Sequence, residues 1–335
     1  MFSLPKQPKP GSPGSSCNDL EGGSDTNPIK IPGIQAAQFR NLLLFFYGNM
    51  TDPDYRSLVL GVTNETRFGS WFGLSASFKR YLDIASLAHR FCMDSVETWA
   101  LGQFKGVMQS AKGISNLSPD YTDLFGALEY SKLTPDRELE RDARNLAQCY
   151  ISNTNSATRT LPPNTISCNT LVRIYKDPLL KQKDPALFGH VFCVVLSAGY
   201  LSLIWKALTR DDRSKLLAAQ VYLTPLPSTL PTGWIHNLSE ISEAINTQSR
   251  QNCFVNCSRS FINRFTQVIN SPDFLKDSPL VGVTAVSKLA THRQSMAETF
   301  KVAKCTCASQ LLTMIDLKMD ALLTELAETY HDRID

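Results

Sequence analysis

Two close pairs of cysteines come nearest to a recognisable chemistry in this sequence. Cys253 and Cys257 are separated by three residues, and Cys305 and Cys307 by one. Four thiolates are a complete tetrahedral ligand set for Zn²⁺, so the pairs could hold a structural zinc ion if the fold brings them together. The spacing also fits small apolar thiols that pack the last helices, because cysteines two positions apart on a helix point about 200° away from each other. We predict that the four cysteines lie close together, with zinc and metal-free packing both open.

The other polar residues do not match a known catalytic motif. The sequence has no glycine-rich phosphate loop, no His-Glu-x-x-His and no Gly-x-Ser-x-Gly. Its five histidines are far apart, and none forms a recognisable ligand motif with a cysteine or a carboxylate. We therefore predict a protein that is not an enzyme and binds no cofactor, structural zinc being the alternative. The competing hypothesis is an enzyme with an unrecognised motif, which would need a pocket where titratable groups converge.

Composition and charge limit the partners and the compartment. The 335 residues include 34 Lys and Arg against 31 Asp and Glu, a net charge of +3, and the basic residues are scattered among acidic ones. This pattern predicts neither a nucleic-acid nor a membrane partner. The start, residues 1–6, lacks the pattern of a secretory signal, so we expect an intracellular protein of the cytoplasm or nucleus. The apolar run Val191–Trp205 is interrupted by Ser197, Gly199 and Ser202, and we interpret it as a buried core helix.

Hydrophobic periodicity predicts a mainly α protein, in which a partial α/β layer is followed by an irregular α-helical bundle. We expect a Pro/Gly/Ser-rich flexible segment at 1–28, a partial domain at 29–110, a helical region at 118–235, and at 236–335 a C-terminal region with the cysteine pairs and a long terminal helix. The expected helices are 35–47, 81–92, 96–104, 136–150, 168–175, 187–208, 213–223, 254–269 and 286–330, with a strand at 28–32 and loops at 49–75, 153–164, 225–231 and 271–279.

Two helical faces are candidate contact surfaces with other proteins. The first lies on the 35–47 helix, where apolar residues recur three and four positions apart. The second is a seam of heptad spacing in the terminal helix, which either packs on the chain's own domain or joins two chains in a homo- or hetero-oligomer. The candidate contact residues are Phe39, Leu43, Phe46, Leu312, Met319 and Leu326.

Three stretches of the chain resemble a known family. Residues 21–31 (EGGSDTNPIKI) look like its loop and strand, residues 39–47 (FRNLLLFFY) like its next helix, and residues 81–101 like its closing helix pair. In this order they resemble the second half of a BTB/POZ domain of the divergent kind found in fungal proteins. The resemblance implies a protein-interaction module that forms homodimers or heterodimers, and some members of the family are substrate adaptors of cullin ubiquitin ligases.

The first half of that domain has no counterpart here, so helices 35–47 and 81–104 should carry apolar faces that the C-terminal region or another chain must cover. The function that we predict is a BTB/POZ-type interaction module, a scaffold or adaptor in transcription or ubiquitin-ligase assembly. The alternatives are an enzyme with an unrecognised active site and a zinc-stabilised, nucleic-acid-associated regulator.

Overall fold

The computed structural model describes residues 31–60, 71–110, 120–152, 166–235, 280–303 and 308–330. Within these ranges the chain is mainly helical, which confirms the predicted class, and it contains no β-strand. The α/β layer is therefore not shown. The expected strand at 28–32 lies mostly outside the described residues, and its last two positions are not in a strand. No helix in these ranges is long and apolar enough to cross a membrane.

The N-terminal layer contains α1 (Ala36–Tyr47), α2 (Pro53–Leu60), α4 (Trp71–Arg90) and α5 (Asp94–Ser110). Helix α4 packs along α5 and also against α1, and Phe78 meets Phe104 across the α4–α5 contact with ring centroids 4.8 Å apart. The predicted helices at 35–47, 81–92 and 96–104 are confirmed. The predicted loop at 49–75 is wrong over α2 and over the first turn of α4. Asp52 starts α2 by accepting a hydrogen bond from the backbone N–H of Asp54 at 2.8 Å.

The middle of the chain contains α6 (Tyr121–Leu133) and α7 (Arg137–Ser152), which pack on each other. Asp136 begins α7, because its Oδ1 accepts hydrogen bonds from the backbone N–H groups of Glu138 and Leu139, both at 3.1 Å. Helix α7 was among the expected helices, whereas α6 was not. Helix α6 also packs on α4, so the region after the N-terminal layer covers part of that layer.

The next group contains α8 (Cys168–Tyr175), α9 (Pro178–Lys183), α10 (Pro185–Ser197), α11 (Leu203–Ala207), α12 (Arg210–Leu223) and the short 3₁₀ helix η3 (Gly233–Ile235). All side chains of α10 from Ala186 to Leu196 are buried, so the apolar run forms a core helix as predicted. The single helix expected at 187–208 is wrong, since Gly199 with φ 73° reverses the chain. Ser202 then accepts a hydrogen bond from the N–H of Trp205 and starts α11.

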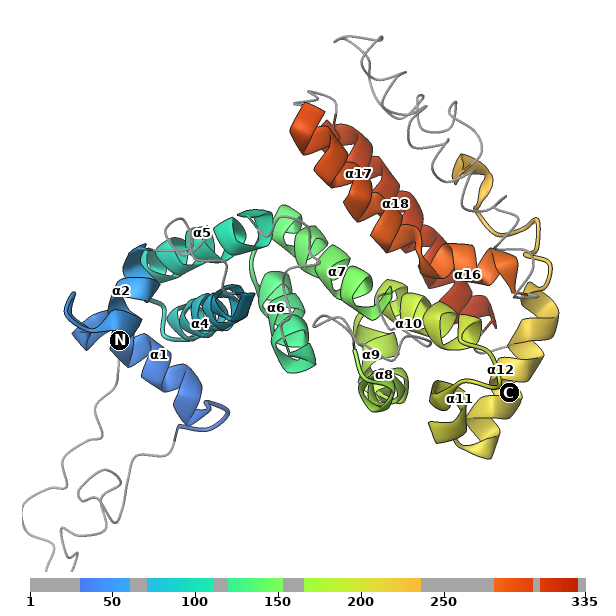
Figure 1. Cartoon of the computed structure of the whole chain (residues 1–335), viewed down its shortest axis with the longest axis horizontal. Coiled ribbons are helices and arrows are strands. Elements are labelled where there is room, and N and C mark those ends of the chain that lie inside the picture. Colours follow the sequence, from blue (N-terminus) through green and yellow to red (C-terminus); the bar gives the residue numbers. More distant parts are fainter. Residues whose placement is uncertain are drawn as a thin grey trace, which may run out of the picture.

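The C-terminal group contains α16 (Val281–Ser287), α17 (Leu289–Ala303), α18 (Ala308–Glu325) and the π-helical turn η4 (Leu326–Tyr330). The continuous helix expected at 286–330 is therefore divided into shorter helices. Figure 1 shows an arc of helices from α1 at one end to α12 at the other, with α17 and α18 side by side. Helix α18 crosses α10 and holds the C-terminal group on the middle of the chain.

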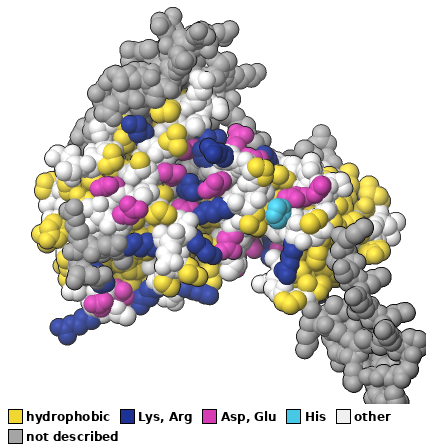
Figure 2. All heavy atoms as spheres, turned by 180° about the vertical axis from the view of Figure 1, so that it is seen from behind, with side chains coloured by type: hydrophobic (Ala, Val, Ile, Leu, Met, Phe, Trp, Pro, Cys, Tyr) yellow, Lys and Arg dark blue, Asp and Glu magenta, His cyan; other side chains and the backbone are white. Residues whose placement is uncertain are grey.

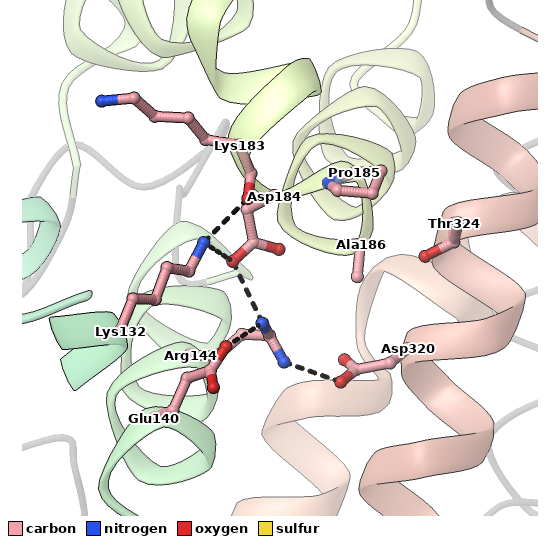
Figure 3. A pocket seen from close by; sticks show the side chains of 9 residues that line it. All are labelled: Lys132, Glu140, Arg144, Lys183, Asp184, Pro185, Ala186, Asp320 and Thr324. Atoms are coloured by element: carbon pink, nitrogen blue, oxygen red, sulfur yellow. Dashed lines mark hydrogen bonds and ion pairs between the residues drawn. The ribbon is translucent and has the colours of Figure 1, made fainter. Parts of the chain in front are cut away.

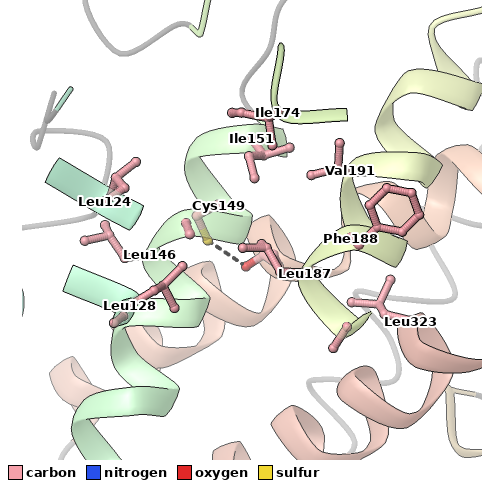
Figure 4. Close-up of a cluster of buried hydrophobic side chains, with 14 of the residues drawn as sticks. Leu124, Leu128, Leu146, Cys149, Ile151, Ile174, Leu187, Phe188, Val191 and Leu323 are labelled. Atoms are coloured by element: carbon pink, nitrogen blue, oxygen red, sulfur yellow. Dashed lines mark hydrogen bonds between the residues drawn. The ribbon is translucent and has the colours of Figure 1, made fainter. Parts of the chain in front are cut away.

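One hydrophobic core runs through all of these groups. Buried side chains of the N-terminal layer, the middle, the α8–α12 group and the C-terminal group belong to a single cluster. Figure 4 shows its centre, where side chains of α6, α7, α10 and α18 meet: Leu124, Leu128, Leu146, Cys149, Leu187, Phe188 and Leu323. Each group is thus stabilised by contacts with the next.

Candidate interaction surface

Helix α1 presents apolar side chains to solvent. Leu42 is buried, but Phe46 is 50 % exposed and Tyr47 is 82 % exposed, and Leu43 and Met50 are also exposed. Of the residues predicted on this helix, Leu43 and Phe46 lie on the outward side and Phe39 is half-buried. We call Leu43, Phe46, Tyr47 and Met50 the α1 surface. Hydrophobic side chains also gather over the N-terminal layer at the right of Figure 2.

The inner side of α1 is fixed by specific contacts. Asn41 donates a hydrogen bond from Nδ2 to Oδ2 of Asp83 on α4 at 2.8 Å, and Asp83 is buried. Burial raises the pKa of the Asp83 carboxyl, although Lys79 and Asn41 act in the opposite direction. Phe45 packs on Trp99 of α5 with ring centroids 4.5 Å apart. These contacts hold α1 in one orientation, so the exposure of the α1 surface follows from the fold.

The predicted seam of the terminal helix lies inside the chain. Met319 and Leu326 are each 1 % exposed, and Leu312 is half-buried. These side chains pack where α18 and η4 meet α10 and α17. Of the two alternatives for the seam, the structure shows packing on the chain's own domain, because α10 is buried and needs an apolar partner on this side. Met319 and Leu326 are thus core residues and cannot serve as an open contact surface in this structure.

The four cysteines of the predicted zinc site, Cys253, Cys257, Cys305 and Cys307, lie outside the described residues. Their proximity and a shared zinc ion stay predictions. Within the described ranges, no group of three or more His, Cys, Asp or Glu side chains is arranged to hold a metal ion. Burial raises the pKa of two other thiols, Cys149 and Cys193, to about 12, so both act as small core side chains.

A charged pocket of about 370 Å³ lies between α6, α7, α10 and α18. Figure 3 shows how its side chains meet. Asp184 accepts from Lys132 Nζ at 3.0 Å and Arg144 Nε at 3.2 Å, and its other oxygen caps α10 through the backbone N–H of Leu187 at 3.0 Å. The lining residues are Lys132, Glu140, Arg144, Lys183, Asp184, Pro185, Ala186, Asp320 and Thr324.

Arg144 is the centre of this pocket. Besides Asp184, its guanidinium donates to Asp320 on α18 at 2.9 Å and to Glu140 on its own helix at 2.9 Å. Lys183 turns outward and pairs with Glu129 at 2.8 Å. Because three acidic groups balance three basic groups in the lining of the pocket, the geometry supports a clamp between helices better than a site for a charged ligand.

The half-buried Ser152 and the buried His190 form a second polar group. His190 Nε2 lies 2.9 Å from the carbonyl oxygen of Gln148 and 2.9 Å from Ser152 Oγ. Since a carbonyl oxygen only accepts, Nε2 carries the hydrogen. The Ser152 hydroxyl in turn has two carbonyl acceptors, those of Gln148 at 3.0 Å and Ser287 at 2.8 Å. The hydroxyl proton is thus directed at a carbonyl, so this group joins α7, α10 and α16 and lacks the geometry of a nucleophile with its base.

We expect His190 and Asp320 to give opposite contributions to stability in acid. Burial lowers the pKa of His190 from 6.5 to about 4, so its contribution is present above pH 6.5 and is lost as pH falls to 4, at a cost of about 3 kcal/mol. Burial raises the pKa of Asp320 from 3.8 to about 6, although Arg144 opposes the shift, so protonation of Asp320 stabilises the fold as pH falls through this window. After allowance for its partial exposure, that gain is about 2 kcal/mol.

Urea unfolding of Asp320→Asn between pH 6.5 and 4 tests this balance. As pH falls, the free energy of unfolding should decrease more in Asp320→Asn than in the wild type, because the variant keeps the destabilising contribution of His190 and lacks the stabilising protonation of Asp320. His190→Gln should show the opposite difference in slope. Equal slopes in all three proteins would contradict both assignments.

Comparison of the chain with protein-family models, with curated proteins and with solved structures found no match.

Proposed function

We propose that this protein is an interaction module of the BTB/POZ type, which works as a scaffold or adaptor, in transcription or in ubiquitin-ligase assembly. It binds other proteins, including other copies of itself, through the α1 surface. The observation that carries the proposal is the exposure of Leu43, Phe46, Tyr47 and Met50 on and just after a helix whose opposite side is fixed by Asp83 and Trp99.

The chemistry of the α1 surface supports protein binding. Aromatic side chains contribute much of the energy at protein interfaces, because they bury a large area and lose little conformational entropy. Phe46 and Tyr47 are adjacent, and Phe46 packs edge-on against Phe45 with ring centroids 5.4 Å apart. Because the Phe46 ring is already held against Phe45, it loses less conformational entropy when a partner covers it.

The helix order of the N-terminal layer also supports the proposal. The resemblance requires one helix at 39–47 and a closing pair over 81–101, and α1, α4 and α5 cover these residues. The strand that the resemblance assigns to 21–31 belongs to the proposal, since residues 21–30 lie outside the described ranges. The proposal thus rests on the helical half of the motif and on the α1 surface.

Phe46→Glu is expected to abolish association with little change in folding. A carboxylate at the centre of the α1 surface would have to be buried without a partner in any complex, which costs several kcal/mol, whereas a half-exposed side chain contributes only about 1 kcal/mol to the fold. The measurement is sedimentation of the purified full chain over a range of concentrations, together with affinity purification from cells. Proteins that the wild type retains, copies of the chain included, should be missing from the variant.

Leu317→Glu provides the matched control, because Leu317 is comparably exposed but lies on α18. It should sediment and co-purify like the wild type. If the wild type is a monomer that retains no protein, or if Phe46→Glu and the control retain the same proteins, the α1 surface is not the binding site.

A further inference from the structure

Helix α12 carries a second outward stripe whose character changes along its length. Successive residues of a helix turn by about 100°, so the exposed residues Arg210, Arg213, Ser214, Leu217 and Val221 share one face. We call these five residues the α12 stripe. It is cationic in the first turns and apolar in the last turns, over about 16 Å. The opposite face is buried through Leu216, Ala219 and Leu223.

The segment of the chain that contains the stripe, residues 166–223, is more basic than the chain as a whole. Residues 166–223 expose six basic side chains, whereas only Asp177 and Asp211 are exposed acidic ones. The nearby Asp212 already has partners, because it pairs with Lys176 at 3.3 Å and accepts a hydrogen bond from the Thr209 hydroxyl. Arg210 and Lys206 have no ion-pair partner among the described residues. The exposed basic residues are Arg173, Lys176, Lys183, Lys206, Arg210 and Arg213, of which Lys183 pairs with Glu129 on α6.

Apolar side chains are exposed beside these cations. Val221 is 75 % exposed and Tyr222 is also exposed, although Leu223 next to them is buried. The turn before α11 exposes Tyr200 and Leu201, the latter by 72 %, and Leu203 at the start of α11 is also exposed. Figure 2 shows basic and hydrophobic side chains, with a few acidic ones among them, at its lower left, on the α11–α12 side of the molecule.

We propose that the α12 stripe binds an acidic segment of a partner protein, which lays carboxylates against Arg210 and Arg213 and apolar side chains against Leu217 and Val221. Charge complementarity selects an acidic partner. The face changes from cationic to apolar along the helix, which favours a protein segment over a membrane as the partner. A helix that lies on a bilayer instead presents a uniformly apolar face with its cations beside it. The stripe and the α1 surface lie at opposite ends of the arc in Figure 1, so this site does not depend on the proposed function.

The test is to pan a phage-displayed library of random dodecapeptides on the immobilised full chain, and on Arg210→Glu/Arg213→Glu and Val221→Glu in parallel. Peptides enriched on the wild type should carry acidic residues toward one end and apolar residues toward the other. In fluorescence anisotropy, the double charge reversal and Val221→Glu should each weaken a selected peptide by about ten-fold or more. Added salt should weaken binding to the wild type, and to Val221→Glu, more than binding to the charge-reversed chain.

Arg137→Glu and Leu317→Glu are the controls, because both residues are exposed on other helices. These variants should bind the selected peptide within about two-fold of the wild type. The proposal is overturned if no acidic peptide is enriched or if the stripe variants bind the peptide like the controls. It is also overturned if vesicles of phosphatidylserine and phosphatidylcholine compete with the peptide for the wild type and the stripe substitutions do not weaken peptide binding.

Discussion

Gly189→Ala is expected to destabilise the protein by about 3 kcal/mol or more. Gly189 lies in α10 where α18 crosses it, and a Cβ atom built there would be 1.8 Å from the carbonyl oxygen of Leu323 and 2.7 Å from its carbonyl carbon. These are backbone atoms, so no rotamer change can relieve the overlap and the two helices must separate. The separation would open the contact that holds the C-terminal group on the core. Urea unfolding monitored by circular dichroism measures the loss.

The same substitution at Gly106 is the matched control. Gly106 lies in the exposed face of α5, and a Cβ atom there has no neighbour within 4 Å. Alanine favours a helix over glycine by about 1 kcal/mol, so Gly106→Ala should stabilise the protein. If both substitutions changed stability in the same direction, the close crossing of α10 and α18 would be wrong.

Arg293→Met is expected to cost about 3 to 5 kcal/mol. Arg293 on α17 is buried and forms two hydrogen bonds of 2.8 Å to the carboxylate of Asp316 on α18, which also accepts from Asn145 at 3.2 Å. Methionine keeps much of the volume but leaves the Asp316 carboxylate buried without its main partner. Thermal and urea unfolding should both show the loss.

The double variant Arg293→Met/Asp316→Leu distinguishes a lost ion pair from lost packing. Arg293→Met leaves the Asp316 carboxylate with only Asn145 and the 3.5 Å pair to Arg141 Nε. The double variant removes this carboxylate, so it should recover much of the stability that Arg293→Met loses. Lys183→Met breaks the pair with Glu129, in which both side chains are exposed, and should change stability little. A double variant as unstable as the single one would show that the guanidinium acts by packing.

Local sequence patterns predicted much of the helical fold. Helices α1, α5, α7 and α8 were predicted from local residue patterns, and α10 was predicted in part from its apolar run, because these signals are carried within a few positions. Helix α6 was missed because its apolar residues do not fall on a single stripe: Leu124, Leu128 and Tyr130 are all buried, between neighbours on more than one side. The reversal at Gly199 depends on a positive φ, which glycine permits but does not require.

Long-range pairings explain what the sequence could not show about the sites. The period of the terminal seam identified Met319 and Leu326 as apolar contact residues, but a period does not say whether the partner is α10 or another chain. The clamp between Arg144 and Asp320 joins residues 176 positions apart, so no local pattern indicates it. Leu43 and Phe46 of the α1 surface were predicted from their spacing, whereas Tyr47 and Met50 were not among the predicted contact residues.

Site-specific photo-crosslinking tests the central claim, that the α1 surface binds protein, most directly. Benzoylphenylalanine replaces Phe46 in one full-length chain and Leu317 in another, both exposed side chains on different helices. After irradiation in cells, we expect crosslinked protein adducts from position 46, to a second copy of the chain or to another protein, and none from position 317. Adducts of the same kind from both positions, or none from position 46, would contradict the proposed function.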